Sequence, residues 1–254
     1  MGVQTSKILS AVSPQIPQFI RAAENIIPER SCLNVQPLLE RIKVNAHNLN
    51  FGVRIFRHDL SISPEFGLQF SGLCTDLPAI KCYLYAHVFQ PNGRIELTHE
   101  RVMGFRQDCV RKLLHETIHA VQFGENKQTG VEDTRVFGTA RERQKYSRQF
   151  PQPSVIEKDL RYLADSAEIE SYASCIAMEW TCTALRTKTW FQFLKHWRTH
   201  HRGLDVIRYK AMDFYADYWR EGWSTHSVMR RLRKKVHEFA DAYRALPVLE
   251  ALYT

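Results

Sequence analysis

Residues 115–119 read His-Glu-Thr-Ile-His, an HExxH motif within an otherwise apolar segment. Residues four apart lie on one face of an α-helix, so His115 and His119 can present their imidazoles to one metal ion. Glu116 then lies beside the metal position, where a carboxylate can accept a proton from a zinc-bound water. The motif therefore predicts a helix that carries two Zn²⁺ ligands, His115 and His119, and a general base, Glu116.

The segment around the motif has helical periodicity, and we predict a helix over residues 106–123 that ends before Gly124. His115, His119 and Gln122 form a polar file at positions i, i+4 and i+7 of this helix. Burying such a file without partners is unfavourable, and a metal ion would supply one. The alternative is a pair of core histidines that hydrogen-bond to neighbouring groups.

A catalytic zinc site with two histidines needs a further protein ligand. The best candidates lie in residues 165–180, which we predict to form a helix with an apolar face and several small residues. Glu168 and Glu170 flank that face, and both remain open as ligands at this point. Each is also compatible with an ordinary surface carboxylate.

Strand character precedes the motif. Residues 53–57 alternate as a strand does, residues 67–70 do so more weakly, and residues 82–89 and 94–99 flank a Pro91-Asn92-Gly93 turn. This turn predicts a β-hairpin. We therefore expect a small antiparallel sheet packed on the motif helix, which makes the fold class α+β.

Three regions of one compact unit are predicted: a helical scaffold over residues 1–50, a catalytic core over residues 51–183, and a helical lobe over residues 184–254. In the first region a helix is expected to begin near Pro37. In the last, residues 186–237 contain thirteen Lys and Arg against four Asp and Glu, interleaved with aromatic residues. Such a region can bind nucleic acid or another polyanion, or it can be a helical lobe with a solvated basic face.

Six cysteines without a CxxC pair predict reduced, core-packed thiols in a cytoplasmic protein. No apolar run approaches the about 18 residues of a membrane span, and the N-terminus lacks the features of a secretory signal. The first residues, with Gly2 and Ser6, match a myristoylation pattern that many unmodified chains also carry.

The HExxH motif followed by a glutamate-bearing helix resembles the gluzincin branch of the zinc metallopeptidases. Residues 115–122 and 168–173 are more closely similar to small phage-encoded metallopeptidase-like proteins. Over residues 106–179 the likeness implies a zincin-like fold, Zn²⁺ held by His115, His119 and Glu168, and peptide-bond hydrolysis by a metal-bound water that Glu116 activates. Tyr172, His99 or a loop arginine are candidates for stabilising the oxyanion.

The sequence departs from this family at three points. Thr117 is polar where the family usually has a bulky apolar residue, Ser171 replaces an alanine, and the gap from His119 to Glu168 is long. Glu170 therefore stays open as an alternative third ligand.

The phage likeness also admits a virion or assembly protein with a structural or vestigial zinc site. Its partners would then be virion proteins rather than a protein or peptide substrate, and its location the virion rather than the host cytoplasm. Residues 113–120 are also similar to Spartan-type proteases, which cut proteins crosslinked to DNA, and a basic C-terminal region suits such a substrate. That family takes its third ligand from a glycine-histidine-glycine stretch, whereas His196 and His200 lie among basic and aromatic residues and are interpreted as surface residues.

Overall fold

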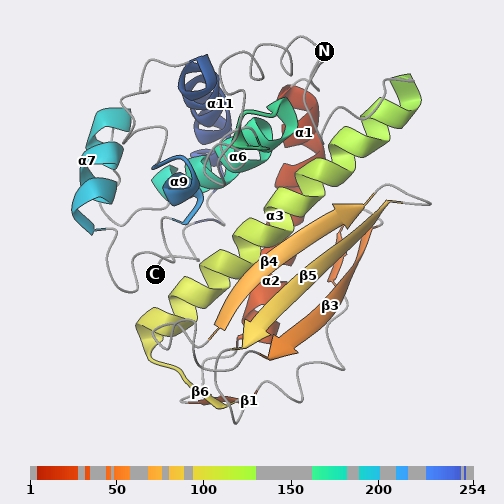
Figure 1. Cartoon of the computed structure of the whole chain (residues 1–254), viewed down its shortest axis with the longest axis vertical. Coiled ribbons are helices and arrows are strands. Elements are labelled where there is room, and N and C mark those ends of the chain that lie inside the picture. Colours follow the sequence, from red (N-terminus) through yellow and green to blue (C-terminus); the bar gives the residue numbers. More distant parts are fainter. Residues whose placement is uncertain are drawn as a thin grey trace, which may run out of the picture.

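The computed structural model describes residues 5–27, 32–34, 44–46, 49–57, 68–75, 80–88, 94–129, 162–181, 189–200, 210–216, 227–246 and 249. Its helices are α1 (Thr5–Val12), the 3₁₀ turn η1 (Ser13–Gln15), α2 (Ile16–Ile26), α3 (His99–Thr129), α6 (Ser166–Thr181), α7 (Trp190–His200), α9 (Lys210–Phe214) and α11 (Ser227–Tyr243). Its strands are β1 (Cys32–Asn34), β2 (Val44–Ala46), β3 (Leu49–Arg57), β4 (Leu68–Thr75), β5 (Lys81–Val88) and β6 (Arg94–Glu96). The predicted α+β class is confirmed (Figure 1).

The larger sheet has the order β2-β3-β5-β4 and is mixed rather than antiparallel. Strand β5 runs antiparallel to β4 but parallel to β3, with Phe51 opposite Cys82. A parallel neighbour requires a crossover connection instead of a tight turn. In the sequence β4 follows β3, but in the sheet β5 lies between β3 and β4. The chain therefore passes the position of β5 on its way from β3 to β4.

The hairpin predicted across Pro91-Asn92-Gly93 is wrong. Strand β6 pairs with β1 in a separate two-stranded sheet, with Ile95 opposite Leu33. Both edges of β5 are occupied by β3 and β4, so β5 has no free edge for β6. The antiparallel neighbours are instead β4 and β5, one element earlier in the chain.

The N-terminal region is helical only in its first part. Helices α1 and α2 bury an apolar face, and Pro14 and Pro17 lie in the first turns of η1 and α2, where a missing N–H is tolerated. Strands β1 and β2 then fall within residues 1–50, so the prediction of helices throughout this region is wrong there. The residues that follow Pro37 directly lie outside the described residues, and the three-region division stays a prediction.

Helix α3 begins seven residues before its predicted start. Thr98 accepts the Arg101 N–H on its Oγ1 at 3.3 Å, which caps the first turn, and Glu100 places a negative charge near the helix N-terminus. Gly124 does not end the helix, which continues to Thr129. The second predicted helix, over residues 165–180, is confirmed as α6.

Helix α3 lies between the sheet on one side and helices α6, α7, α9 and α11 on the other (Figure 1). It packs against β4, α2 and α6, and α6 packs in turn against α11. Both α3 and α6 are buried around most of their circumference, as expected for central helices. Any polar side chain in their middle turns must therefore find a partner inside the protein.

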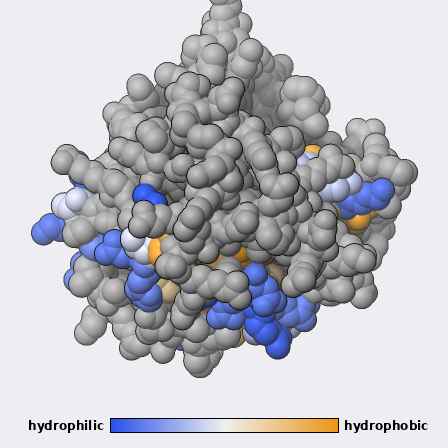
Figure 2. All heavy atoms as spheres, turned by 90° about the horizontal axis from the view of Figure 1, so that it is seen from below, coloured by the Kyte–Doolittle hydropathy of each residue, from blue (hydrophilic) through white to orange (hydrophobic). Residues whose placement is uncertain are grey.

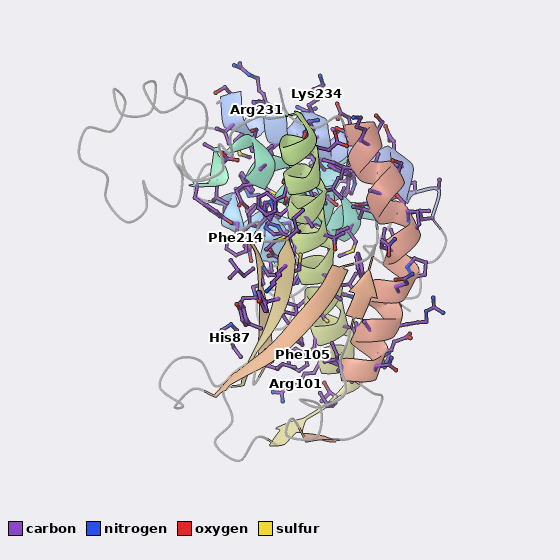
Figure 3. The ribbon with its side chains drawn as sticks, turned by 90° about the vertical axis from the view of Figure 1, so that its right-hand side faces the viewer. His87, Arg101, Phe105, Phe214, Arg231 and Lys234 are labelled. Carbon is purple, nitrogen blue, oxygen red and sulfur yellow. The ribbon has the colours of Figure 1, made fainter. Side chains whose placement is uncertain are left out.

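The C-terminal helices bury their aromatic residues and expose their charges. Trp190, Trp197 and Tyr215 are buried, whereas Phe191 is 75% exposed. Arg231 and Lys234 of α11 point away from the body of the protein (Figure 3). The face seen in Figure 2 is mostly hydrophilic where residues are described, with only small hydrophobic spots. Among the described helices, none has the length and apolar character to cross a membrane.

Candidate metal centre

The structure brings His115 and His119 of α3 together with Glu168 of α6. The two Nε2 atoms lie 3.1 Å apart. Glu168 places Oε2 at 3.4 Å from Nε2 of His115 and Oε1 at 3.3 Å from Nε2 of His119. All three ligand atoms lie within 4.8 Å of one another, and this is the one such group of His, Cys, Asp or Glu side chains in the described part of the chain. These three residues could hold a metal ion.

Burial and mutual contact shift the ionisation of this group. The three residues are only 4–6% exposed. Burial would raise the pKa of Glu168, but the two imidazoles outweigh it and hold this pKa well below its usual value. Burial lowers the pKa of His115, whereas at His119 the Glu168 carboxylate outweighs burial and raises the pKa to about 9. A divalent cation bound by these residues would take the place of the proton on His119.

Two atoms of the group lack a hydrogen bond within the described structure: Nδ1 of His115 and Oε2 of Glu168. The contact of this oxygen with Nε2 of His115, at 3.4 Å, is long for a hydrogen bond, and a cation would compensate such a buried carboxylate better. Two imidazole nitrogens and one carboxylate oxygen form a donor set that suits zinc and leaves a coordination position open. The residues present therefore fit a metal ion better than they fit a pair of satisfied core histidines.

Gln122 orients His119 from the opposite side of the ring. Its Oε1 lies 2.9 Å from Nδ1 of His119, and its Nε2 donates to Oε2 of Glu170 at 3.1 Å. Glu170 is held in turn by Lys235 of α11 at 3.0 Å. Glu170, the alternative third ligand, therefore does not contact the histidines directly in this network. It contacts Gln122, which in turn contacts His119.

For a metal ion bound at this centre, with zinc as the probe, we expect Gln122→Ala to weaken binding by about 10–100-fold, the usual effect of losing a group that orients a metal-bound histidine. The reason is that His119 loses the acceptor that fixes its tautomer. Competition with a chromogenic chelator measures the change. Gln192→Ala, on the exposed side of α7, is the matched control and should leave zinc affinity unchanged.

Glu116 lies on the sheet side of the centre. It is 5% exposed, and its side chain packs against Gly72 of β4. A Cβ atom built on Gly72 would lie 2.5 Å from both Cγ and Oε1 of Glu116, a separation that Cβ atoms in proteins essentially never show. The absence of a side chain at position 72 thus makes the room that Glu116 occupies. Sequence reasoning missed Gly72 because this proximity depends on tertiary packing.

Two tyrosines border the centre. The ring of Tyr172 meets that of His115 edge to face, with centroids 4.7 Å apart. Tyr162 is 48% exposed, and partial burial together with the nearby Glu168 carboxylate raises the pKa of its hydroxyl, which stays protonated and able to donate. His99 lies at the start of α3, about 24 Å along the axis from His115, and is too distant to act as an oxyanion donor.

A second buried cluster ties the helices of the centre together. Arg111, one turn before His115, contacts Oε1 of Glu179 at 2.7 Å and Oδ1 of Asp108 at 3.2 Å. Glu179 also accepts the N–H groups of Ala211 and Met212 at the start of α9. The cluster joins α3, α6 and α9, and breaking such a buried pair typically destabilises a protein by about 3–5 kcal/mol.

The departures from the family pattern have structural explanations. The Thr117 hydroxyl is fully buried and donates to the carbonyl of Leu113 at 2.7 Å, so this polar residue is satisfied within its own helix. Ser171 donates to the carbonyl of Ala167 at 3.0 Å, and its Oγ lies 3.5 Å from Nδ1 of His119. The long segment between α3 and α6 lies mostly outside the described residues. The two helices that it connects nevertheless place Glu168 in contact with His119.

Comparison of the chain with models of known protein families, with curated proteins and with solved structures finds no match. The inference that these residues could hold a metal ion therefore depends on their geometry and on the chemistry of their donor atoms.

Proposed function

We propose that the protein is a zinc-dependent peptidase with a gluzincin-like centre on a zincin-like fold. The observation that carries the proposal is the convergence of His115, His119 and Glu168 from two central helices, with both histidines in the predicted HExxH spacing. A buried carboxylate, Glu116, follows directly after the first histidine. Three ligands and an adjacent base are the minimum set for hydrolysis by this class of enzyme.

When bound, zinc supplies a Lewis acid that acidifies water and polarises the scissile carbonyl. Glu116 accepts the proton of the attacking water and passes it to the leaving amine. Gln122 keeps His119 in one tautomer, and the neighbouring Tyr162 hydroxyl is a candidate donor to the oxyanion. The buried setting strengthens each of these electrostatic interactions.

The edge of β4 is the candidate edge for aligning an extended peptide. Strand β4 is the terminal strand of its sheet, and its Gly72 contacts Glu116. An extended peptide could pair with the backbone of β4 and bring its scissile bond to the centre. Asp108 already accepts the Phe70 N–H at 3.0 Å, which confines such pairing to the stretch after Phe70.

Metal analysis combined with a substrate assay tests the proposal. Wild-type protein should bind one zinc per chain and cleave a denatured, fluorescently labelled protein. Glu168→Gln should lose most of the zinc, whereas Glu170→Gln should retain stoichiometric zinc with at most the moderate weakening expected for a supporting residue. Retention of zinc by Glu168→Gln would refute the assignment of the third ligand.

The burial of the centre favours a second candidate, in which zinc only joins α3 to α6 in a virion or assembly protein. Each of the three residues is less than 7% exposed, as in a structural site. Stoichiometric zinc without cleavage of any protein substrate is the result that this candidate predicts. For a DNA-associated protease, Trp190, Trp197 and Tyr215 are buried and cannot stack on bases, whereas Phe191 is exposed and can.

A further inference from the structure

Two thiols face each other on the inner side of the larger sheet. Cys74 of β4 stands directly opposite Cys82 of β5, and their Sγ atoms lie 3.0 Å apart. Cys82 is fully buried and Cys74 is 9% exposed. The sulfur atoms are already closer than ordinary contact distance, and a disulfide would bring them to about 2.05 Å.

The register of the strands suits a crosslink at this position. Phe70 donates its N–H to Asp108, which lies outside the sheet, and this direction indicates that Phe70 and Ala86 form a non-hydrogen-bonded pair. Moving four residues along each strand makes Cys74 and Cys82 a pair of the same class. The Cα atoms of such pairs lie about 4.5 Å apart, within the ~4.4–6.8 Å that disulfides span. The backbone therefore needs little movement to accept the bond.

We propose that Cys74 and Cys82 form a reversible intrachain disulfide by exchange with a small-molecule disulfide. Cys74 lies on the terminal strand of the sheet and is the more accessible thiol, so it attacks the oxidant, forms a mixed disulfide and releases one small thiol. Cys82 then attacks the Cys74 sulfur, which forms the intrachain bond and releases the second small thiol. The two cysteines lose two hydrogens, and the oxidant is reduced to two thiols.

Cys109 and Cys175, the two other cysteines whose side chains the structure describes, are not arranged in this way. Cys175 donates its S–H to the Arg111 carbonyl at 3.4 Å, and burial raises the pKa of its thiol to about 12. Burial also raises the pKa of Cys109 far above its usual value. Because the thiolate is the attacking species, exchange at these two positions is disfavoured.

The disulfide would lie beneath the candidate metal centre. In the thiol form, Sγ of Cys82 lies 3.7 Å from the backbone carbonyl of Glu116 and donates to it. Oxidation removes that proton and joins the terminal strand β4 to β5 at the same place. The metal ligands come from α3 and α6, so the disulfide can form whether or not the protein is a peptidase.

Thiol counting on the full-length protein tests the proposal. After incubation of the folded protein with oxidised glutathione and removal of the oxidant, denatured wild-type protein should show four free thiols in place of the six in the sequence. Dithiothreitol should restore all six. Peptide mapping without reduction should recover a crosslinked fragment that contains Cys74 and Cys82.

Two variants complete the test. Cys74→Ser should form no intrachain disulfide, whereas Cys175→Ser, the matched control, should still lose two thiols. Because peptide mapping of the wild-type protein needs no variant, the test survives a variant that does not fold. An unchanged count of six thiols, mixed disulfides alone, or a crosslink that maps to any other pair would overturn the proposal.

Discussion

Glu116→Gln is expected to lower kcat/KM for a cleaved protein substrate by about 10²–10⁴-fold, the range that a general base contributes. Glutamine keeps the size of the side chain and its packing against Gly72, but it cannot accept a proton from water. The metal ligands are untouched, so zinc content should remain at one per chain. Turnover of a labelled substrate and metal analysis of the same sample measure the two effects.

The matched control for this variant is Glu100→Gln. Glu100 lies on the same helix, α3, but it is exposed at the N-terminus, far from the centre. It should leave both turnover and zinc content unchanged. If Glu116→Gln retains wild-type turnover, the mechanism with Glu116 as general base is wrong, whatever the metal content shows.

The HExxH geometry could be predicted because it depends on local structure alone. A spacing of four residues within a helix places His115 and His119 side by side whatever surrounds the helix, and the pattern of apolar residues identified both α3 and α6. The choice between Glu168 and Glu170 needed the structure. These residues are two apart on α6, so the rotation of that helix against α3 decides which of them meets the histidines.

Pairing and packing between distant segments could not be read from sequence. The Pro-Asn-Gly turn marks a change of direction, but it does not say that β6 pairs with β1. The cluster of Asp108, Arg111 and Glu179 likewise depends on contacts between residues far apart in the chain. The start of α3, unlike these contacts, depends on a local signal in the sequence. Thr98 is a capping residue, and it indicates a helix that begins well before residue 106.

Gly72 extends the candidate site to a residue with no functional group. Its strand, β4, passes so close to α3 that a methyl group at position 72 would overlap Glu116 at three atoms. The side chain of Glu116 is flexible, and rotating it away is easier than moving the backbone of β4, which is held by β5 and by the bond from Phe70 to Asp108. A side chain at position 72 therefore displaces the proposed base while the sheet stays in place.

We accordingly expect Gly72→Ala to lower kcat/KM by a factor approaching that of Glu116→Gln, about 10²-fold or more. Zinc content should be retained and the thermal unfolding midpoint only modestly changed. Leu73→Ala is the matched control, because residue 73 points to the opposite face of the sheet and is 45% exposed. Combining Gly72→Ala with Glu116→Gln should lower activity little beyond either change alone, since both remove the same base. Fully additive losses would show that Gly72 acts through some route other than the position of Glu116.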